Sequence, residues 1–130
     1  MVIKGFRKAI AFCVVVSIAA IGTIANAEPS NKWRILFDHS TDGAGEVVFR
    51  ITPLNGTPID VTTQLPKGTG ENQAAQLVKK SLKAALGKGY KIEVDDFETV
   101  LIKKTGKTPD FDLTMASSSI SGLSINLKRE

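Results

Sequence analysis

The sequence predicts an α+β domain with a single, mainly antiparallel sheet and one amphipathic helix packed on one of its faces. Apolar residues alternate with a period of two in seven short segments, which is typical of strands with one buried face. Between the third and fourth segments the period lengthens to about 3.6, which indicates one helix. The expected order is therefore β-β-β-α-β-β-β-β, with the sheet either carrying the helix on one face or curling around it.

Residues 1–27 are expected to be a cleavable export signal. The segment begins with three basic residues and no acid: Lys4, Arg7 and Lys8. An apolar stretch follows from residue 9 to about 24, and Ala25-Asn26-Ala27 supplies the small residues that a signal peptidase requires. The apolar stretch is shorter than the roughly 20 residues that span a bilayer, which argues against an uncleaved anchor.

Residues 28–130 would then form one mature domain in the periplasm or outside the cell. The only cysteine, Cys13, lies inside the signal, so neither a disulfide nor thiol chemistry is expected. Cleavage leaves 14 basic against 13 acidic residues, a net charge of +1 in place of +4. This balance disfavours nucleic-acid binding, and no second apolar run is long enough to span a membrane.

The first three strands are expected at 33–37, 46–51 and 59–65, where large apolar residues alternate. Residues 39–45 between the first two strands are polar and rich in glycine, so these strands are predicted to form a hairpin. A second turn is expected at 53–58, which contains two prolines and Asn55-Gly56.

The helix is expected at about 71–87. Its apolar residues fall within a sector about 120° wide: Ala74, Ala75, Val78, Leu82, Ala85 and Leu86. Glu71 lies in the first turn, where the helix dipole favours an acid, and Gly87 or Gly89 supplies the C-terminal stop. The apolar face is expected to complete a core with four aromatic residues: Trp33, Phe37, Phe49 and Phe111.

Four further strands are expected near 90–94, 100–102, 111–115 and 125–127, joined by short turns as a meander. The first of these turns is acidic and spans 95–98.

Asp38, Ser40, Asp42 and Glu46 are candidate cation ligands. From Asp38 onward, oxygen-bearing side chains stand at alternate positions and a glycine follows, as at the start of a calcium loop. The twelfth position of such a loop is Phe49 instead of a bidentate glutamate, and strands instead of helices flank the segment. A polar turn is the alternative interpretation.

Lys67, Gly68, Thr69 and Gly70 are candidate ligands for a phosphate or carboxylate, because they precede the N-terminus of the helix. Their order does not match a P-loop, in which the lysine follows the last glycine. The alternative is that Thr69 or Gly70 simply caps the helix.

Lys79, Lys80 and Lys83 form a basic helix face opposite the apolar one, suited to anionic lipid, glycan or an acidic partner. An ordinary solvated helix surface is the alternative. Lysines at 103, 104 and 107 form a second basic patch, and the fold decides whether the two patches join.

No catalytic site is expected. His39 is the only histidine, so a zinc site with several histidines is excluded and no other imidazole base is available to the serines at 117–124. The acidic residues at 93–98 surround one hairpin, where carboxylates point apart instead of facing each other across a cleft. A hydrolase that uses Asp38, Glu46 or this turn is the least favoured hypothesis.

The leading hypothesis is a non-enzymatic exported interaction module that binds a protein or cell-surface ligand through a sheet edge, its turns or the lysine face. The alternative is a small-ligand or cation-binding protein that uses residues 38–46 and requires no cofactor other than calcium. A calcium-dependent rise in melting temperature distinguishes the two. The oligomeric state is left open, because an exposed strand edge can pair with a second copy.

Overall fold

The structure is a computed structural model that describes residues 28–130; the predicted export signal at 1–27 lies outside the described residues. The elements follow the predicted order: β2 (Lys32–Asp38), β3 (Gly45–Pro53), β4 (Ile59–Leu65), α2 (Glu71–Leu86), the 3-10 turn η2 (Gly87–Gly89), β5 (Tyr90–Asp95), β6 (Thr99–Lys104), β7 (Phe111–Ser118) and β8 (Ser124–Arg129). No helix in this part of the chain is long and apolar enough to cross a membrane.

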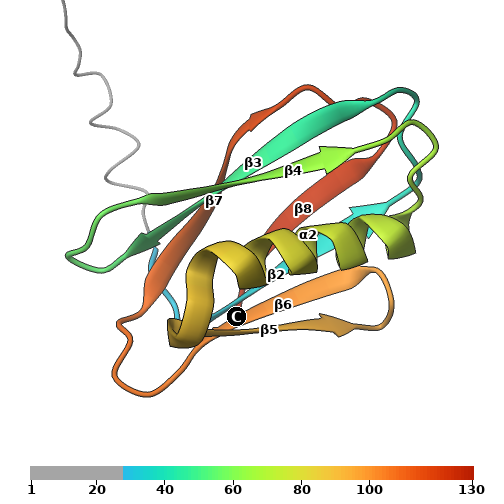
Figure 1. Ribbon diagram of the computed structural model, residues 1–130. Coiled ribbons are helices and arrows are strands. Elements are labelled where there is room, and N and C mark those ends of the chain that lie inside the picture. The colour runs from blue at the N-terminus through green and yellow to red at the C-terminus, as the bar shows by residue number, and fades with distance from the viewer. Residues whose placement is uncertain (1–27) are drawn as a thin grey trace, which may run out of the picture.

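The strands form two antiparallel sheets, so the predicted single sheet is wrong although the α+β class is confirmed. One sheet has the order β5-β6-β2-β8 and the other the order β4-β3-β7. Figure 1 shows α2 lying along the side where β4 and β5 form the sheet edges, and the helix contacts both strands. One helix is too narrow to cover seven strands, whereas two sheets that face each other bury each other's apolar residues.

The predicted hairpin of the first two strands is also wrong. β2 pairs with β6 on one side, where Trp33 lies opposite Ile102, and with β8 on the other, where Trp33 lies opposite Arg129. The predicted meander holds only for β5 and β6, because β7 pairs with β3. Alternation along a strand specifies which face is buried and leaves the neighbouring strand undetermined.

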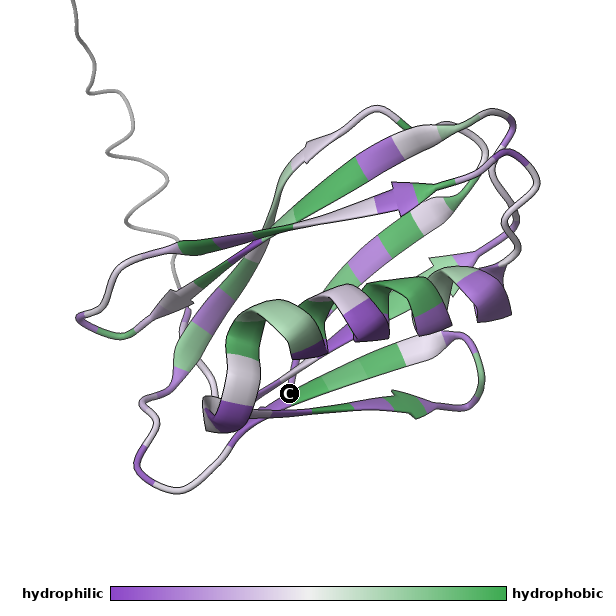
Figure 2. Ribbon diagram, viewed as in Figure 1, coloured by the Kyte–Doolittle hydropathy of each residue, from purple (hydrophilic) through white to green (hydrophobic). Residues whose placement is uncertain are grey.

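The four aromatic residues expected in the core, Trp33, Phe37, Phe49 and Phe111, are all buried there. α2 adds four buried residues from the predicted apolar face: Ala74, Ala75, Val78 and Leu82. Figure 2 shows hydrophobic and hydrophilic residues following one another along several strands. Ala85, predicted on the same helix face, is exposed, whereas Leu86 next to it is half-buried and packs against the core.

The start of the described chain ties the two sheets together. Ser30 and Phe111, at the start of β7, exchange backbone hydrogen bonds of 2.8 and 2.9 Å. The Ser30 hydroxyl donates to the carbonyl of Glu130 at 2.6 Å, immediately after β8. The indole N–H of Trp33 donates to the Phe111 carbonyl at 2.8 Å. These contacts fix the two sheets relative to each other at one end of the molecule.

Candidate interaction surface

The turn before α2 is held from within the protein by Thr41. The Thr41 hydroxyl donates to the Pro66 carbonyl at 2.7 Å and accepts the amide N–H of Thr69 at 2.8 Å. The amide N–H of Gly68 donates to the Thr41 carbonyl at 3.0 Å. Two of the backbone amides expected to bind an anion are therefore already engaged, and Thr69 is buried.

Gly70 is the N-cap residue of α2, and no side chain caps this end of the helix. Ser40 forms an isolated bridge with Gly70, so the first part of the candidate cation segment lies against the helix N-terminus. Six residues line a shallow depression of about 500 Å³ here: His39, Ser40, Gly70, Glu71, Asn72 and Gln73. The structure thus brings two of the predicted segments together, which the sequence did not indicate.

Three of the candidate cation ligands make hydrogen bonds to three different parts of the chain. Asp38 accepts the backbone N–H of His39 at 2.9 Å, and Glu46 accepts the side-chain N–H of Gln64 at 2.8 Å. The backbone N–H of Asp42 donates to the Ser121 carbonyl at 2.9 Å. Within residues 28–130 no three acidic or histidine side chains are grouped so as to hold a metal ion, and calcium binding stays a prediction.

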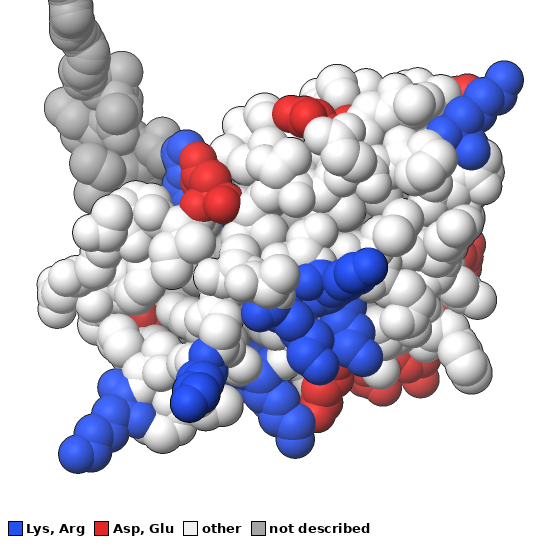
Figure 3. All heavy atoms as spheres, in the orientation of Figure 1, with Lys and Arg blue, Asp and Glu red and all other residues white. Residues whose placement is uncertain are grey.

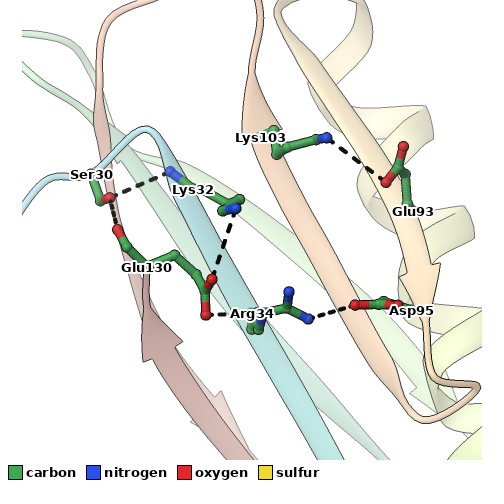
Figure 4. A network of polar contacts seen from close by, with 7 residues as sticks. All are labelled: Ser30, Lys32, Arg34, Glu93, Asp95, Lys103 and Glu130. Carbon is green, nitrogen blue, oxygen red and sulfur yellow. Dashed lines mark hydrogen bonds and ion pairs between the residues drawn. The ribbon is translucent and has the colours of Figure 1, made fainter.

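Two acidic residues of the β5–β6 hairpin, Asp95 and Glu93, each contact a basic side chain. Arg34 on β2 lies 2.7 Å from Asp95 and 2.9 Å from Glu130, and the hydrogen bond to Asp95 is the main cause that raises the Arg34 pKa (Figure 4). Lys91 approaches Glu93 to 3.1 Å, and this hydrogen bond is the main cause that lowers the pKa of Glu93. Glu93 and Asp95 are therefore engaged with cations on the outer face of the four-stranded sheet.

Lys79, Lys80 and Lys83 lie on the solvent side of α2, as predicted. Together with Gln76 and Leu77 they line a depression of about 400 Å³, called the helix groove below. Leu77 is half-buried and packs against the core, so it gives the groove an apolar floor. None of the three lysines forms an ion pair among the described residues. Figure 3 shows basic side chains gathered over α2.

Only the end of the second basic patch adjoins the first in the fold, because Lys103 lies 4.0 Å from Glu93 and Lys104 lies 3.6 Å from Asp110. The amide N–H of Thr105 donates to the Gly89 carbonyl at 3.0 Å, and the Thr105 hydroxyl donates to the Lys88 carbonyl at 3.0 Å. The loop after β6 therefore lies against η2 at the end of the helix. Lys88 and Lys107 form no ion pair in the part of the chain that the structure describes. The basic surface is defined here as five lysines: Lys79, Lys80, Lys83, Lys88 and Lys107.

Phe97 is a surface feature that sequence reasoning missed. It lies at the tip of the β5–β6 hairpin, and 76% of its surface is exposed. Its φ of 63° and the φ of 51° at Asp96 are both in the left-handed region, which large side chains rarely adopt. The available signal was one aromatic residue inside an otherwise acidic turn, but a search for alternation passes over isolated apolar residues.

The sequence matches no model of a known protein family and no curated protein.

Proposed function

We propose that the protein is a non-enzymatic interaction module, exported to the periplasm or cell surface, that binds an acidic polypeptide through its basic surface. The observation that supports this proposal is that three lysines without an acidic partner among the described residues line the apolar-floored helix groove, and Lys88 and Lys107 lie near the end of the same helix. Like charges placed together repel one another in the free protein, and a partner's carboxylates relieve this repulsion.

The composition of the groove favours a polypeptide over a simple anion. Leu77 offers an apolar contact, and the long aliphatic stems of the lysines can cover further apolar surface while their ammonium groups stay in water. A partner that alternates acidic and apolar side chains satisfies both parts of the groove. Residues 28–130 carry nearly equal numbers of basic and acidic side chains, so the attraction of the domain for an acidic partner is restricted to this side.

The contacts of the acidic side chains and the exposure of His39 support a binding role rather than catalysis. Glu46 is engaged by Gln64, and Asp95 by Arg34. The His39 side chain is 71% exposed, and its acidic neighbour within 4.0 Å is Asp38 from the adjacent position. An imidazole in water beside one carboxylate lacks the enclosed geometry that general-base catalysis requires.

A labelled polyglutamate peptide tests the proposal by fluorescence anisotropy at low salt. Lys80→Gln/Lys83→Gln removes two charges from the helix groove, and Lys128→Gln/Arg129→Gln removes two exposed charges from β8. The first pair should weaken binding about fivefold or more, since each exposed ion pair contributes up to about 1 kcal/mol, and the second pair less than about twofold. Binding should also fall steeply with added salt.

Equal weakening by both double variants would mean that only net charge matters, and absence of binding by the unaltered protein would reject the proposal. Crosslinking in the native envelope fraction, followed by mass spectrometry, then identifies the physiological partner. Loss of that crosslink in Lys80→Gln/Lys83→Gln, with retention in the control pair, would assign the partner to the helix groove.

A further inference from the structure

The tip of the β5–β6 hairpin presents an aromatic ring to water at an energetic cost. Phe97 is 76% exposed and left-handed at φ 63°, next to Asp96 at φ 51°. Non-glycine residues in this region cost on the order of 1 kcal/mol or more each, and an exposed phenyl ring recovers none of it by burial. A left-handed φ is ordinary in a tight hairpin turn, but glycine, asparagine or aspartate usually occupies it, so an exposed phenylalanine there is unusual and is available to contact another molecule.

The tip is also acidic and firmly positioned. Asp96 and Glu98 flank the ring, and neither forms an ion pair among the described residues. The base of the hairpin is held by the 2.7 Å contact between Asp95 and Arg34 and by the 3.1 Å hydrogen bond from the Phe37 amide to the Glu98 carbonyl. The tip is thus a rigid projection with one phenyl ring between two free carboxylates.

The helix groove is complementary to this tip. Leu77 forms an apolar floor for a ring, and the lysines around it supply charges opposite to those of Asp96 and Glu98. A phenyl ring buries about 150 Å² or more, and an ammonium group near its face adds a cation–π attraction. The volume of about 400 Å³ is large enough for one aromatic side chain.

We propose that a second copy of this chain inserts its Phe97 tip into the helix groove. This inference depends on the proposed function, because it names the acidic polypeptide that the basic surface binds. α2 and β5 are neighbours joined through η2, and α2 and the β5–β6 hairpin lie on the same side of the molecule (Figure 1). In this arrangement two copies related by a twofold axis would exchange tip and groove twice, which would close the assembly as a dimer.

Sedimentation-velocity ultracentrifugation of the purified protein over a range of concentrations tests this inference. The protein should show a reversible monomer–dimer equilibrium, and Phe97→Ser should raise the dissociation constant at least tenfold. Leu54→Ser is the matched control, because Leu54 is also an exposed large apolar residue, 51% exposed, on the β3–β4 hairpin. It should leave the equilibrium unchanged, and Trp33 fluorescence verifies that both variants are folded.

A charge exchange tests which surfaces meet. Lys80→Glu/Lys83→Glu and Asp96→Lys/Glu98→Lys should each be monomeric alone. An equimolar mixture should form a heterodimer, because the native tip of the first variant fits the native groove of the second, and the reversed charges of the other tip and groove also attract each other. A protein that stays monomeric up to millimolar concentration, or a dimer that survives Phe97→Ser, would overturn the inference. Binding of polyglutamate by such a monomer would still support the proposed function, so the two failures are distinguishable.

Discussion

Replacing Thr41 with valine tests the hydrogen bonds that hold the turn before α2. Valine keeps the shape of the buried side chain but removes the oxygen that accepts the Thr69 amide at 2.8 Å and the hydroxyl that donates to Pro66 at 2.7 Å. The Pro66 carbonyl keeps the Thr69 hydroxyl at 2.6 Å, whereas the Thr69 amide keeps only a long contact of 3.3 Å. The main loss is therefore one acceptor for a buried amide.

Such a loss should lower the free energy of unfolding by about 1–2 kcal/mol and the melting temperature by roughly 5–10 °C. Urea unfolding followed by fluorescence of Trp33, the only tryptophan, measures this difference directly. Thr62→Val is the control, because Thr62 is exposed on β4, and the change there should stay within about 0.5 kcal/mol. Equal stability of the two variants would refute the role assigned to the Thr41 hydroxyl.

Two further predictions use the same unfolding assay. Gly70→Ser should stabilise the protein by about 0.5–1 kcal/mol, because the N-cap has an extended backbone with no side-chain cap and open space around an added Cβ. Gly68→Ser, where the space is also open but φ is 79°, should instead destabilise it. Hydrogen bonds of 2.8 and 3.0 Å from Arg50 lower the pKa of Asp60 below its ordinary value of 3.8, so wild type should exceed Asp60→Asn in stability at neutral pH. The two should converge as the pH falls through that lowered pKa, and a constant difference at all pH values would contradict the assigned ion pair.

The positions of the secondary-structure elements followed closely from the sequence. β4 occupies residues 59–65 as predicted, and α2 ends at Leu86, one residue before the expected limit. These elements were predictable because each has a run of alternating or helically spaced apolar residues bounded by glycine or proline. Such local patterns specify the type and position of an element independently of how the strands pair.

The pairing of the strands did not follow from the sequence. Residues 39–45 have the composition of a hairpin turn, yet Thr41 and Asp42 in this segment make hydrogen bonds to Thr69 and Ser121 instead of closing a turn between neighbouring strands. The partners of these residues are distant in the chain, and no local pattern encodes them. β3 instead forms a hairpin with β4, through a turn that contains proline, asparagine and glycine.

The candidate surface was predictable only in part. The lysines of α2 followed from helical spacing, but their apolar neighbour Leu77 and the contact between η2 and the loop after β6 depend on tertiary structure. The engagement of the Gly68 and Thr69 amides by Thr41 was likewise hidden, because the two segments are far apart in sequence.

The position of β2 in the middle of its sheet also determines when the fold can be completed. β2 is the first strand of the described chain, and its neighbours are β6 and β8, the last strand. Ser124–Arg129 must therefore be available before β2 is paired on both sides. Contacts between segments so distant in sequence are associated with slow folding. We therefore expect β8 to be acquired late in folding, and a chain interrupted before residue 124 should leave one edge of β2 open to pairing with other chains.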